Sequence, residues 1–214
     1  MTTPKPKVLI CDDHELIREG LRRILVDRGL AGQVGETSSA AEALAATRRE
    51  KWDVVILDIN LCGRNGMEVL KELKAEFPGM PVLMLSSYPE EQFALRAIRA
   101  GASGYLNKNL AARVLVEAIP LVLGGGRYIS PKVAEQLANA VQQPAGQPLH
   151  TQLSDREDQV LRLIATGLAV GEIAAQLHLS VKTVSTYRTI VLRKLGLKNN
   201  AQLMRYAHDH GLGE

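Results

Sequence analysis

Several features that would assign this chain to a familiar class of protein are missing from its sequence. In 214 residues, no apolar run approaches the roughly 20 residues that a membrane-spanning helix requires. The amino terminus, MTTPKPKVLICDDHE, has no apolar stretch of signal-peptide length before acidic residues appear. We therefore expect a cytoplasmic protein with no membrane partner.

Cysteine is also scarce. Cys11 and Cys62 are far apart and form no C-x-x-C pair, so the sequence indicates neither a disulfide framework nor a cysteine zinc site. The histidines lack metal-ligand spacing with cysteines or acids. The chain has no G-x-x-x-x-G-K-[ST] loop, which argues against an enzyme that hydrolyses nucleoside triphosphates.

Acidic residues are missing from one long window, although the net charge of the whole chain is only +3. Between Ile173 and His208 there is no Asp or Glu. The basic residues of this window are Lys182, Arg188, Arg193, Lys194, Lys198 and Arg205. A one-signed window on helices is typical of a protein with an anionic partner.

The first 125 residues alternate between strand-like and helix-like segments. We expect strands at 7–11, 32–36, 53–57, 81–86 and 103–107. Amphipathic helices are expected near 14–28, 39–49, 65–76, 89–99 and 110–123. Five such units predict an α/β fold with a five-stranded parallel sheet, doubly wound in the flavodoxin-like manner. Sites in such folds form beyond the carboxyl ends of the strands.

The rest of the chain has a different pattern. A short helical segment, SPKVAEQLANAV, is followed at 142–152 by a stretch rich in Gln, Pro and Gly. The last third is helical throughout. We therefore expect one domain over residues 1–125, a helix and flexible linker over 126–152, and a small all-α domain over 153–214.

Carboxylates leave the predicted sheet at its carboxyl edge. The run VVIL leads into Asp58, and the first predicted strand leads into Asp12 and Asp13. A lone aspartate after a strand is most often a turn residue. However, strands one and three are commonly neighbours in this architecture, so the three carboxylates would lie together and repel unless a cation joins them. Mg²⁺, a hard ion that binds carboxylate oxygens and water, is the economical candidate.

Two more strand ends carry complementary groups. Ser86 ends the fourth predicted strand and offers a hydroxyl, while Lys108 follows the fifth and offers an ammonium. Each alone could be a turn cap or a solvated side chain. Acid, metal, hydroxyl and ammonium together make a plausible pocket for a phosphoryl group.

The last third contains four helical patterns. Ser154 and Glu157 form a capping-box motif at the start of the first. A short second helix near 170–177, a tight turn and a third helix at 181–194 are typical of a helix-turn-helix. The outer face of the third helix carries short hydroxyls and long cations, which suit phosphates and base edges. A solvated bundle helix would have acids interspersed.

These motifs carry a family resemblance. Residues 7–125 resemble the receiver domain of two-component response regulators through CDDHE, ILDINLCGRNG, LMLSS and GASGYLNK. The segments LSDRE, GEIAAQLHLSVKTVSTYR and LRKLGLKNNAQL resemble the LuxR-type helix-turn-helix. The whole chain is therefore similar to the NarL/FixJ family of response regulators.

The resemblance implies roles for the acidic residues. Asp58 would accept phosphate from the phosphohistidine of a partner histidine kinase. Asp13, Asp58 and the backbone carbonyl of Asn60 would bind Mg²⁺, and Asp12 would assist through water.

The resemblance also implies roles for residues around these acids. Ser86 would donate a hydrogen bond to a phosphoryl oxygen, and Lys108 would pair with it. Tyr105 lies where the family has its switch aromatic, although the strand pattern alone favours a half-buried strand residue. Two departures from the family pattern are Cys62, where proline is usual and a more mobile loop is expected, and Pro120, which should kink or shorten its helix.

For the carboxy-terminal domain, the resemblance implies binding of double-stranded DNA. The implied contact residues are Lys182, Thr183, Ser185, Thr186 and Arg188, with Thr189 and Lys194 nearby. The final helix, about 200–209, would provide the contact of a homodimer on DNA.

Two other functions remain open. A phosphatase or phosphotransferase could use Asp58 as its nucleophile, but haloacid-dehalogenase-like enzymes carry a second aspartate where this chain has Asn60. A DNA-binding protein with an inert receiver-like domain is the second alternative, and the complete set Asp13, Asp58, Ser86 and Lys108 argues against it. We expect a phosphorylation-switched dimeric transcription regulator rather than an enzyme.

Overall fold

The computed structural model describes residues 5–61, 64–88, 90–142 and 148–212. The chain divides into two compact units, Met1–Gln143 and Pro144–Glu214. Within the described ranges, no helix combines the length and the apolar character that crossing a membrane demands. Each unit is considered by itself.

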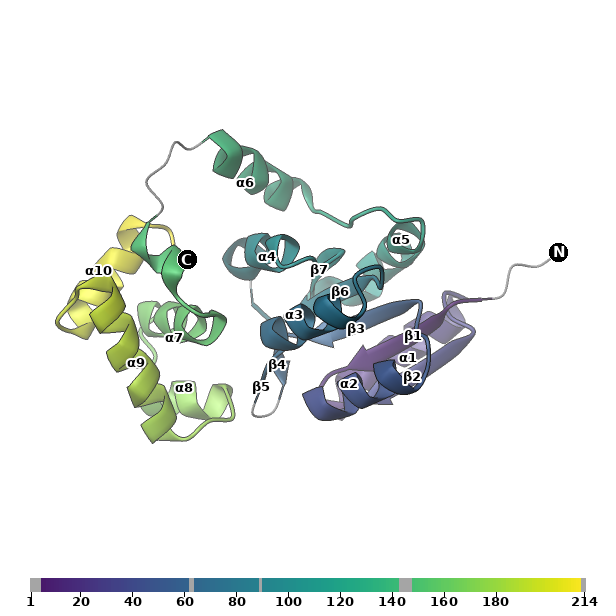
Figure 1. Ribbon diagram of the computed structural model, residues 1–214, viewed down its shortest axis with the longest axis horizontal. Coiled ribbons are helices and arrows are strands. Elements are labelled where there is room, and N and C mark those ends of the chain that lie inside the picture. Colours follow the sequence, from purple (N-terminus) through teal and green to yellow (C-terminus); the bar gives the residue numbers. More distant parts are fainter. Residues whose placement is uncertain (1–4, 62–63, 89, 143–147, 213–214) are drawn as a thin grey trace. The chain divides into compact units, whose positions relative to one another are not determined.

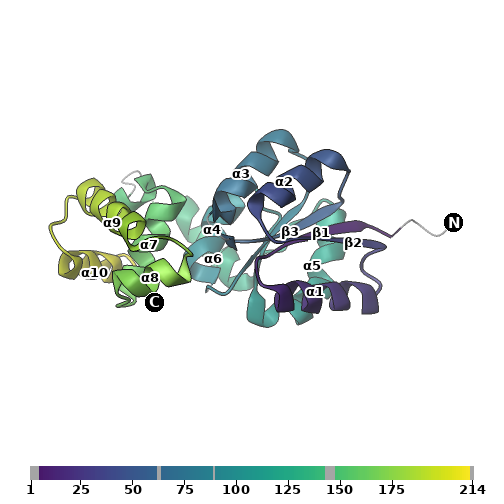
Figure 2. The same cartoon turned by 90° about the horizontal axis from the view of Figure 1, so that it is seen from below.

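The amino-terminal unit is built on a parallel sheet with the strand order β2-β1-β3-β6-β7. The strands are β1 (Lys7–Cys11), β2 (Gln33–Thr37), β3 (Val54–Asp58), β6 (Val82–Ser86) and β7 (Gly104–Asn107). The helices are α1 (Glu15–Asp27), α2 (Ala40–Arg49), α3 (Gly66–Glu76), α4 (Glu90–Arg99) and α5 (Ala111–Leu123). Figures 1 and 2 show α2 and α3 on one face of the sheet and α1 and α5 on the other, so the predicted doubly wound fold is confirmed.

The central strands are buried on both faces, as their uninterrupted apolar sequences require. Every residue of β3 and of β6 is buried. Val54, Ile56 and Leu85 pack in the same cluster as Leu25 of α1 and Leu115 of α5. Full burial of each such large side chain stabilises the fold by about 1.5–3 kcal/mol. This core fixes the positions of the strand ends, where the polar residues begin.

The order of the strands brings two acidic segments together. β1 lies between β2 and β3, and its register pairs Cys11 with Leu57. Asp12 follows β1 directly and Asp58 is the last residue of β3, so both leave the same edge of the sheet. After Asp58, the short strands β4 (Asn60–Leu61) and β5 (Arg64–Asn65) form an antiparallel pair that leads into α3.

Pro120 does not shorten its helix. α5 continues to Leu123, three residues beyond the proline. Pro120 removes the hydrogen bond that a backbone N–H would donate to the carbonyl of Val116, and the helix continues past this gap. The expected effect of Cys62 concerns a residue outside the described ranges.

The helical segment after α5 belongs to the amino-terminal unit. The backbone N–H of Tyr128 donates to the carbonyl of Ser103, and Tyr128 bridges to Gly104 at the edge strand. α6 (Pro131–Gln142) then packs on α4. Of the predicted flexible stretch, residues 149–152 form a short 3₁₀ helix.

The carboxy-terminal unit contains the predicted helix-turn-helix. Its helices are α7 (Asp155–Ala165), α8 (Val170–Gln176), α9 (Val181–Leu195) and α10 (Asn200–Asp209). The capping box between Ser154 and Glu157 is present at the start of α7. α8 and α9 pack against each other, and α7 packs on α9 and α10. Between α8 and α9 the chain turns through His178, whose φ of 52° is in the left-handed region.

Candidate functional site

Three carboxylates meet at the carboxyl edge of the sheet. We term Asp12, Asp13 and Asp58 the acid cluster. One ligand atom from each of them, together with one from His14, lies within 4.8 Å of the others. Asp12 and Asp58 are fully buried, while the side chain of Asp13 is 12% exposed. The cluster is thus open to solvent from the side of Asp13.

A lysine joins two members of the acid cluster. Lys108 Nζ lies 2.7 Å from Asp12 Oδ2 and 2.9 Å from Asp58 Oδ2, and its side chain is only 8% exposed. Lys108 begins a short 3₁₀ helix directly after β7, and the side chain of Asn107 caps that helix by accepting from the N–H of Asn109. Residues from three separate strand ends therefore converge on one point.

The electrostatics of the acid cluster favour a further cation. Burial raises the pKa of Asp58 to about 7, and the charge of Asp12 adds to this rise, although Lys108 and a hydrogen bond from the backbone of Asn60 oppose it. Burial also disfavours the ammonium of Lys108, but the two carboxylates outweigh that effect and raise its pKa. One ammonium does not neutralise the three carboxylates.

The donor set fits a hard divalent ion. Carboxylate oxygens are the ligands that Mg²⁺ prefers, and Mg²⁺ usually keeps several waters, which the side of Asp13 can admit. Asp12, Asp13 and Asp58 would hold the ion. When bound, it would supply positive charge that offsets the charge of a transferring phosphoryl group.

Ser86 and Tyr105 lie next to the acid cluster and are linked through one backbone segment. Ser86 Oγ accepts a hydrogen bond from the N–H of Tyr88 at 3.0 Å. The hydroxyl of Tyr105 donates to the carbonyl of Tyr88 at 3.1 Å, and Tyr105 is 4% exposed. Burial raises the pKa of Tyr105, so the phenol stays protonated and can donate. A shift of Ser86 would therefore be felt by the backbone of Tyr88, which holds Tyr105.

Two residues of this region were not predicted from the sequence. His14 places Nδ1 2.7 Å from Asp13 Oδ1. Gly66 begins α3, and a Cβ at this position would lie 2.0 Å from the backbone oxygen of Asp58. The spacing rule for metal-binding histidines gave no signal for His14, since its neighbours in the cluster come from the same turn and a distant strand. For Gly66, the stretch GRNG indicated a turn but not the close approach to Asp58.

Cys11 lies in the apolar interior, away from solvent. Its side chain is buried at the end of β1 and its sulfur lies 3.6 Å from the carbonyl of Ser39. Burial raises the pKa of the thiol to about 12, so it remains protonated and unreactive. Cys11 acts as a small apolar core residue, as its position suggests.

The carboxy-terminal unit presents the predicted polar face on α9. Lys182, Thr186 and Thr189 are exposed. The opposite side of the helix, with Val184 and Val191, is fully buried. Ser180 caps α9 by accepting from the N–H of Thr183 at 3.0 Å, so the amino-terminal turn of this helix is well defined. Ser185 is half-buried.

Two of the predicted DNA contacts already have partners within the unit. Lys194 Nζ lies 2.6 Å from Oε2 of Glu157, whose carboxylate also belongs to the capping box of α7. Arg188 donates through Nε to the side chain of Asn200 at the start of α10. Both residues thus fasten α9 to the neighbouring helices, whereas Lys182 projects freely from the exposed face.

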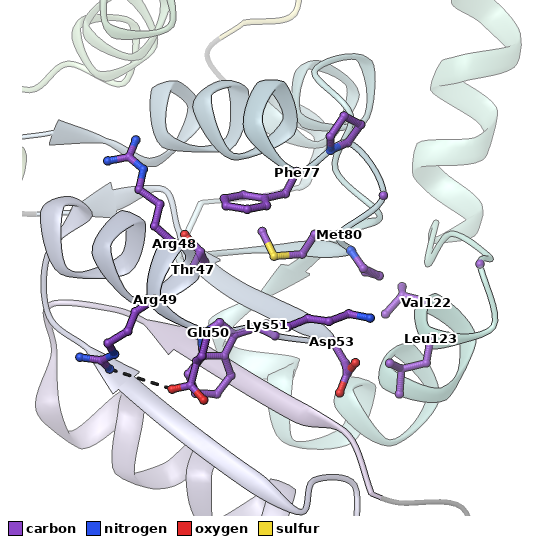
Figure 3. Close-up of a pocket in the computed structure, with 15 residues that line it drawn as sticks. Thr47, Arg48, Arg49, Glu50, Lys51, Asp53, Phe77, Met80, Val122 and Leu123 are labelled. Atoms are coloured by element: carbon purple, nitrogen blue, oxygen red, sulfur yellow. Dashed lines mark ion pairs between the residues drawn. The ribbon is translucent and has the colours of Figure 1, made fainter.

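A cavity in the described part of the chain lies away from the acid cluster. Its volume is about 830 Å³ and it lies beyond the amino ends of β3 and β6, at the opposite edge of the sheet from the acid cluster. Figure 3 shows Phe77 and Met80 on one side of it and Val122 and Leu123 on another, with Lys51 extending between them.

The polar groups around this cavity do not form a reactive constellation. Arg48 is bound to Glu72 and Glu76, and Asp53 accepts a hydrogen bond from the backbone of Lys7. Trp52 also borders the cavity, and its Nε1 donates to the carbonyl of Ala46 at 3.2 Å. The acid cluster, and not the cavity, is therefore the candidate site for chemistry.

Comparison with known proteins agrees with this geometry. Residues 8–120 match the family described as the response regulator receiver domain, and residues 151–207 match the bacterial regulatory proteins of the luxR family. The chain belongs to the response regulators that carry a luxR-type domain. It is thus a NarL/FixJ-type two-component response regulator, which confirms the resemblance found in its motifs.

Similar proteins match over nearly the whole length of this response regulator. The response regulator GacA of Pseudomonas protegens is 37% identical, over 96% of this chain and 97% of its own. The response regulator UvrY of Escherichia coli is 36% identical, over 96% of this chain and 94% of its own. A structure of RcsB from Salmonella enterica serovar Typhimurium, bound to the promoter rprA in the presence of the phosphomimetic BeF3⁻, has a TM-score of 0.62 at 26% identity and covers 95% of this chain and 99% of that chain.

The family decides against one of the two alternatives left by the sequence. Response regulators of this type are transcriptional regulators and not enzymes, so the phosphatase reading of Asp58 is set aside. The acidic residues that a receiver domain uses for a divalent ion are gathered in the acid cluster.

Proposed function

We propose that this response regulator is switched by phosphorylation of Asp58 and, once switched, binds double-stranded DNA as a homodimer to control transcription in the cytoplasm. The observation that carries the proposal is the convergence of Asp12, Asp13, Asp58 and Lys108 at one edge of the sheet. A carboxylate beside a cation-binding cluster and an ammonium can accept a phosphoryl group.

The transfer itself involves one bond made and one bond broken. A carboxylate oxygen of Asp58 attacks the phosphorus of a phosphohistidine on the partner kinase. The N–P bond breaks and its electron pair goes to the imidazole nitrogen, leaving an acyl phosphate on Asp58. Asp12, Asp13 and Asp58 would hold Mg²⁺, with the backbone carbonyl of Asn60 as a further ligand.

The groups around Asp58 would then respond to the new charge. Phosphorylation adds nearly two negative charges. Lys108 would move its ammonium to the phosphoryl oxygens, and Ser86, whose oxygen accepts from the N–H of Tyr88, would turn its hydroxyl hydrogen to them. Tyr105 would follow through the carbonyl of Tyr88. A small shift at Asp58 would thus alter the α4–β7 surface that α6 covers.

The domain organisation that we propose for this switch has three parts. Residues 1–125 form the receiver, 126–152 the connection and 153–214 the DNA-binding domain. In the last of these, the α9 face would contact DNA through Lys182, Thr183, Ser185, Thr186 and Arg188, with Thr189 nearby. Lys194 would contribute less than the exposed residues, because Glu157 already neutralises it.

Phosphoryl transfer from acetyl phosphate in the presence of Mg²⁺ tests the assignment of Asp58. Labelling of the full chain is expected, and loss of labelling in Asp58→Asn, because the amide cannot form an acyl phosphate. Asp53→Asn is the matched control, since this aspartate lies at the opposite end of β3 and should leave labelling unchanged. Equal labelling of the chain and of Asp58→Asn would contradict the proposal.

A further inference from the structure

An imidazole faces the acid cluster. His14 Nδ1 lies 2.7 Å from Asp13 Oδ1 and 3.2 Å from Asp12 Oδ1, and it belongs to the same group of ligand atoms as Asp58. We propose that His14 supplies a nitrogen ligand to the divalent ion of the acid cluster, which makes the site select Mn²⁺ over Mg²⁺. The inference rests on the proposed function of the cluster as a divalent-ion site.

The side chain of His14 has no role in starting its helix. His14 is the residue that precedes α1, a position at which side chains often accept a backbone hydrogen bond, but its ring makes no such bond. Its backbone N–H donates to Asp12 Oδ1 at 2.9 Å, a contact that any residue other than proline would keep. The side chain is 58% exposed, so its removal leaves no hole in the core.

The chemistry of the ring distinguishes it from the carboxylates. Without an ion, Nδ1 is at donor distance from the carboxylate oxygens of Asp13 and Asp12. In the neutral tautomer with the proton on Nε2, the same atom has a lone pair to offer an ion. Mg²⁺ takes oxygen ligands and loses its waters reluctantly, so an added nitrogen gains it little. The divalent first-row transition metals, of which Mn²⁺ is the first, bind nitrogen ligands as well as oxygen ligands. Among them, Mn²⁺ is the one best suited to carboxylates and water. An imidazole beside three carboxylates therefore favours Mn²⁺.

The histidine content of the chain makes the inference testable by spectroscopy. The five histidines are His14, His150, His178, His208 and His210. His14 is the single one in the sequence of the amino-terminal unit, and the others belong to the carboxy-terminal unit. Imidazole modulation that is lost in His14→Ala and kept in His208→Ala therefore assigns the nitrogen to His14.

The experiment measures Mn²⁺ binding to the full chain by electron paramagnetic resonance. Electron spin echo modulation from a coordinated imidazole nitrogen is expected for the unaltered chain and is expected to be absent in His14→Ala. The dissociation constant for Mn²⁺ should rise about tenfold in His14→Ala, while that for Mg²⁺, measured by competition, should change by less than about twofold. His208→Ala is the control, and it should keep the modulation and the affinity.

The outcomes separate this inference from the proposed function. Bound Mn²⁺ without nitrogen modulation, or equal Mn²⁺ affinity with and without His14, would overturn the role of His14 while phosphoryl labelling of Asp58 still stood. No Mn²⁺ binding, with normal labelling in Mg²⁺, would overturn it as well. Mn²⁺ binding that survives in Asp13→Asn would place the ion elsewhere, and the metal part of both proposals would fail.

Discussion

The acid cluster and the α9 face are both charged regions of this response regulator, and they are built in opposite ways. The cluster gathers residues from three strand ends into a small, largely buried volume, where Lys108 is held between Asp12 and Asp58. The α9 face lies along a single helix, and its outer residues point into solvent. Changes in the first should therefore have large and cooperative effects, and changes in the second small and additive ones.

Of the variants that test this contrast, Gly66→Ala should change stability and labelling most. A Cβ at this position would lie 2.0 Å from the backbone oxygen of Asp58, so the strand end or α3 must shift. We expect the free energy of unfolding to fall by about 3 kcal/mol and phosphoryl labelling to be lost. Urea denaturation and acetyl phosphate labelling measure both.

The matched control for Gly66→Ala is Gly20→Ala. No atom lies within 4 Å of a Cβ built at Gly20, which is in the interior of α1. Alanine should stabilise that helix by up to about 1 kcal/mol. If Gly66→Ala kept the stability and the labelling of the unaltered chain, the acid cluster would not be sensitive to displacement of the end of β3, contrary to our expectation.

The second largest effect is expected from Asp58→Asn, on the pH dependence of the free energy of unfolding. The measurement is made in EDTA, so that no bound divalent ion keeps the carboxylates ionised. Burial raises the pKa of Asp58 from 3.8 to about 7, so between these values the folded chain binds a proton that the unfolded chain has lost. The free energy of unfolding should therefore fall as pH rises from about 4 to about 7. Above pH 7, Asp58→Asn should be more stable than the unaltered chain, by an amount on the order of a few kcal/mol.

Denaturant unfolding at a series of pH values measures this difference. Asp27→Asn is the control, because Asp27 has a side chain 62% exposed and should not change the profile. A difference between Asp58→Asn and the unaltered chain that stays constant from pH 4 to pH 8 would show that Asp58 does not titrate in this range.

The smallest effects are expected on the α9 face. Lys182→Ala and Arg188→Ala should each weaken binding to DNA and reduce the slope of log affinity against log salt by about 1, because one phosphate contact is lost. Arg188→Ala should also loosen the junction with α10, since its guanidinium bonds to Asn200. Fluorescence anisotropy over a range of salt concentrations measures the slope.

Lys51→Ala removes the same charge from the receiver and is the control for these variants. It should leave the slope unchanged. If Lys182→Ala and Lys51→Ala lower the slope equally, the effect comes from net charge and α9 is not the contact face.

The sequence predicted the strands, the helix starts and the polar strand ends, because each of these depends on residues close together in the chain. Apolar runs that end in Asp or Ser predicted β3 and β6 and placed polar groups at one edge of the sheet, because parallel strands share that edge. The capping box at Ser154 and Glu157 likewise marked the start of α7. In each of these cases the responsible residues are close together in the chain.

The sequence did not predict contacts between distant segments. The pair of Lys194 and Glu157 joins residues 37 apart, and nothing in either motif indicates it. The same holds for the packing of α6 on α4, since an amphipathic helix does not specify its partner. The approach of Gly66 to Asp58 accompanies the pairing of β4 with β5, which the turn signal in the sequence did not predict.

Trp52 offers a way to observe one half of the protein without the other. It is the chain's single tryptophan, it is 5% exposed, and it lies in the receiver next to the cavity beyond the amino end of β3. Its emission therefore monitors melting of the receiver, while the helix-turn-helix contributes no indole signal. Comparing that emission with the helical circular dichroism of the whole chain reveals whether the halves unfold as one cooperative body or as two.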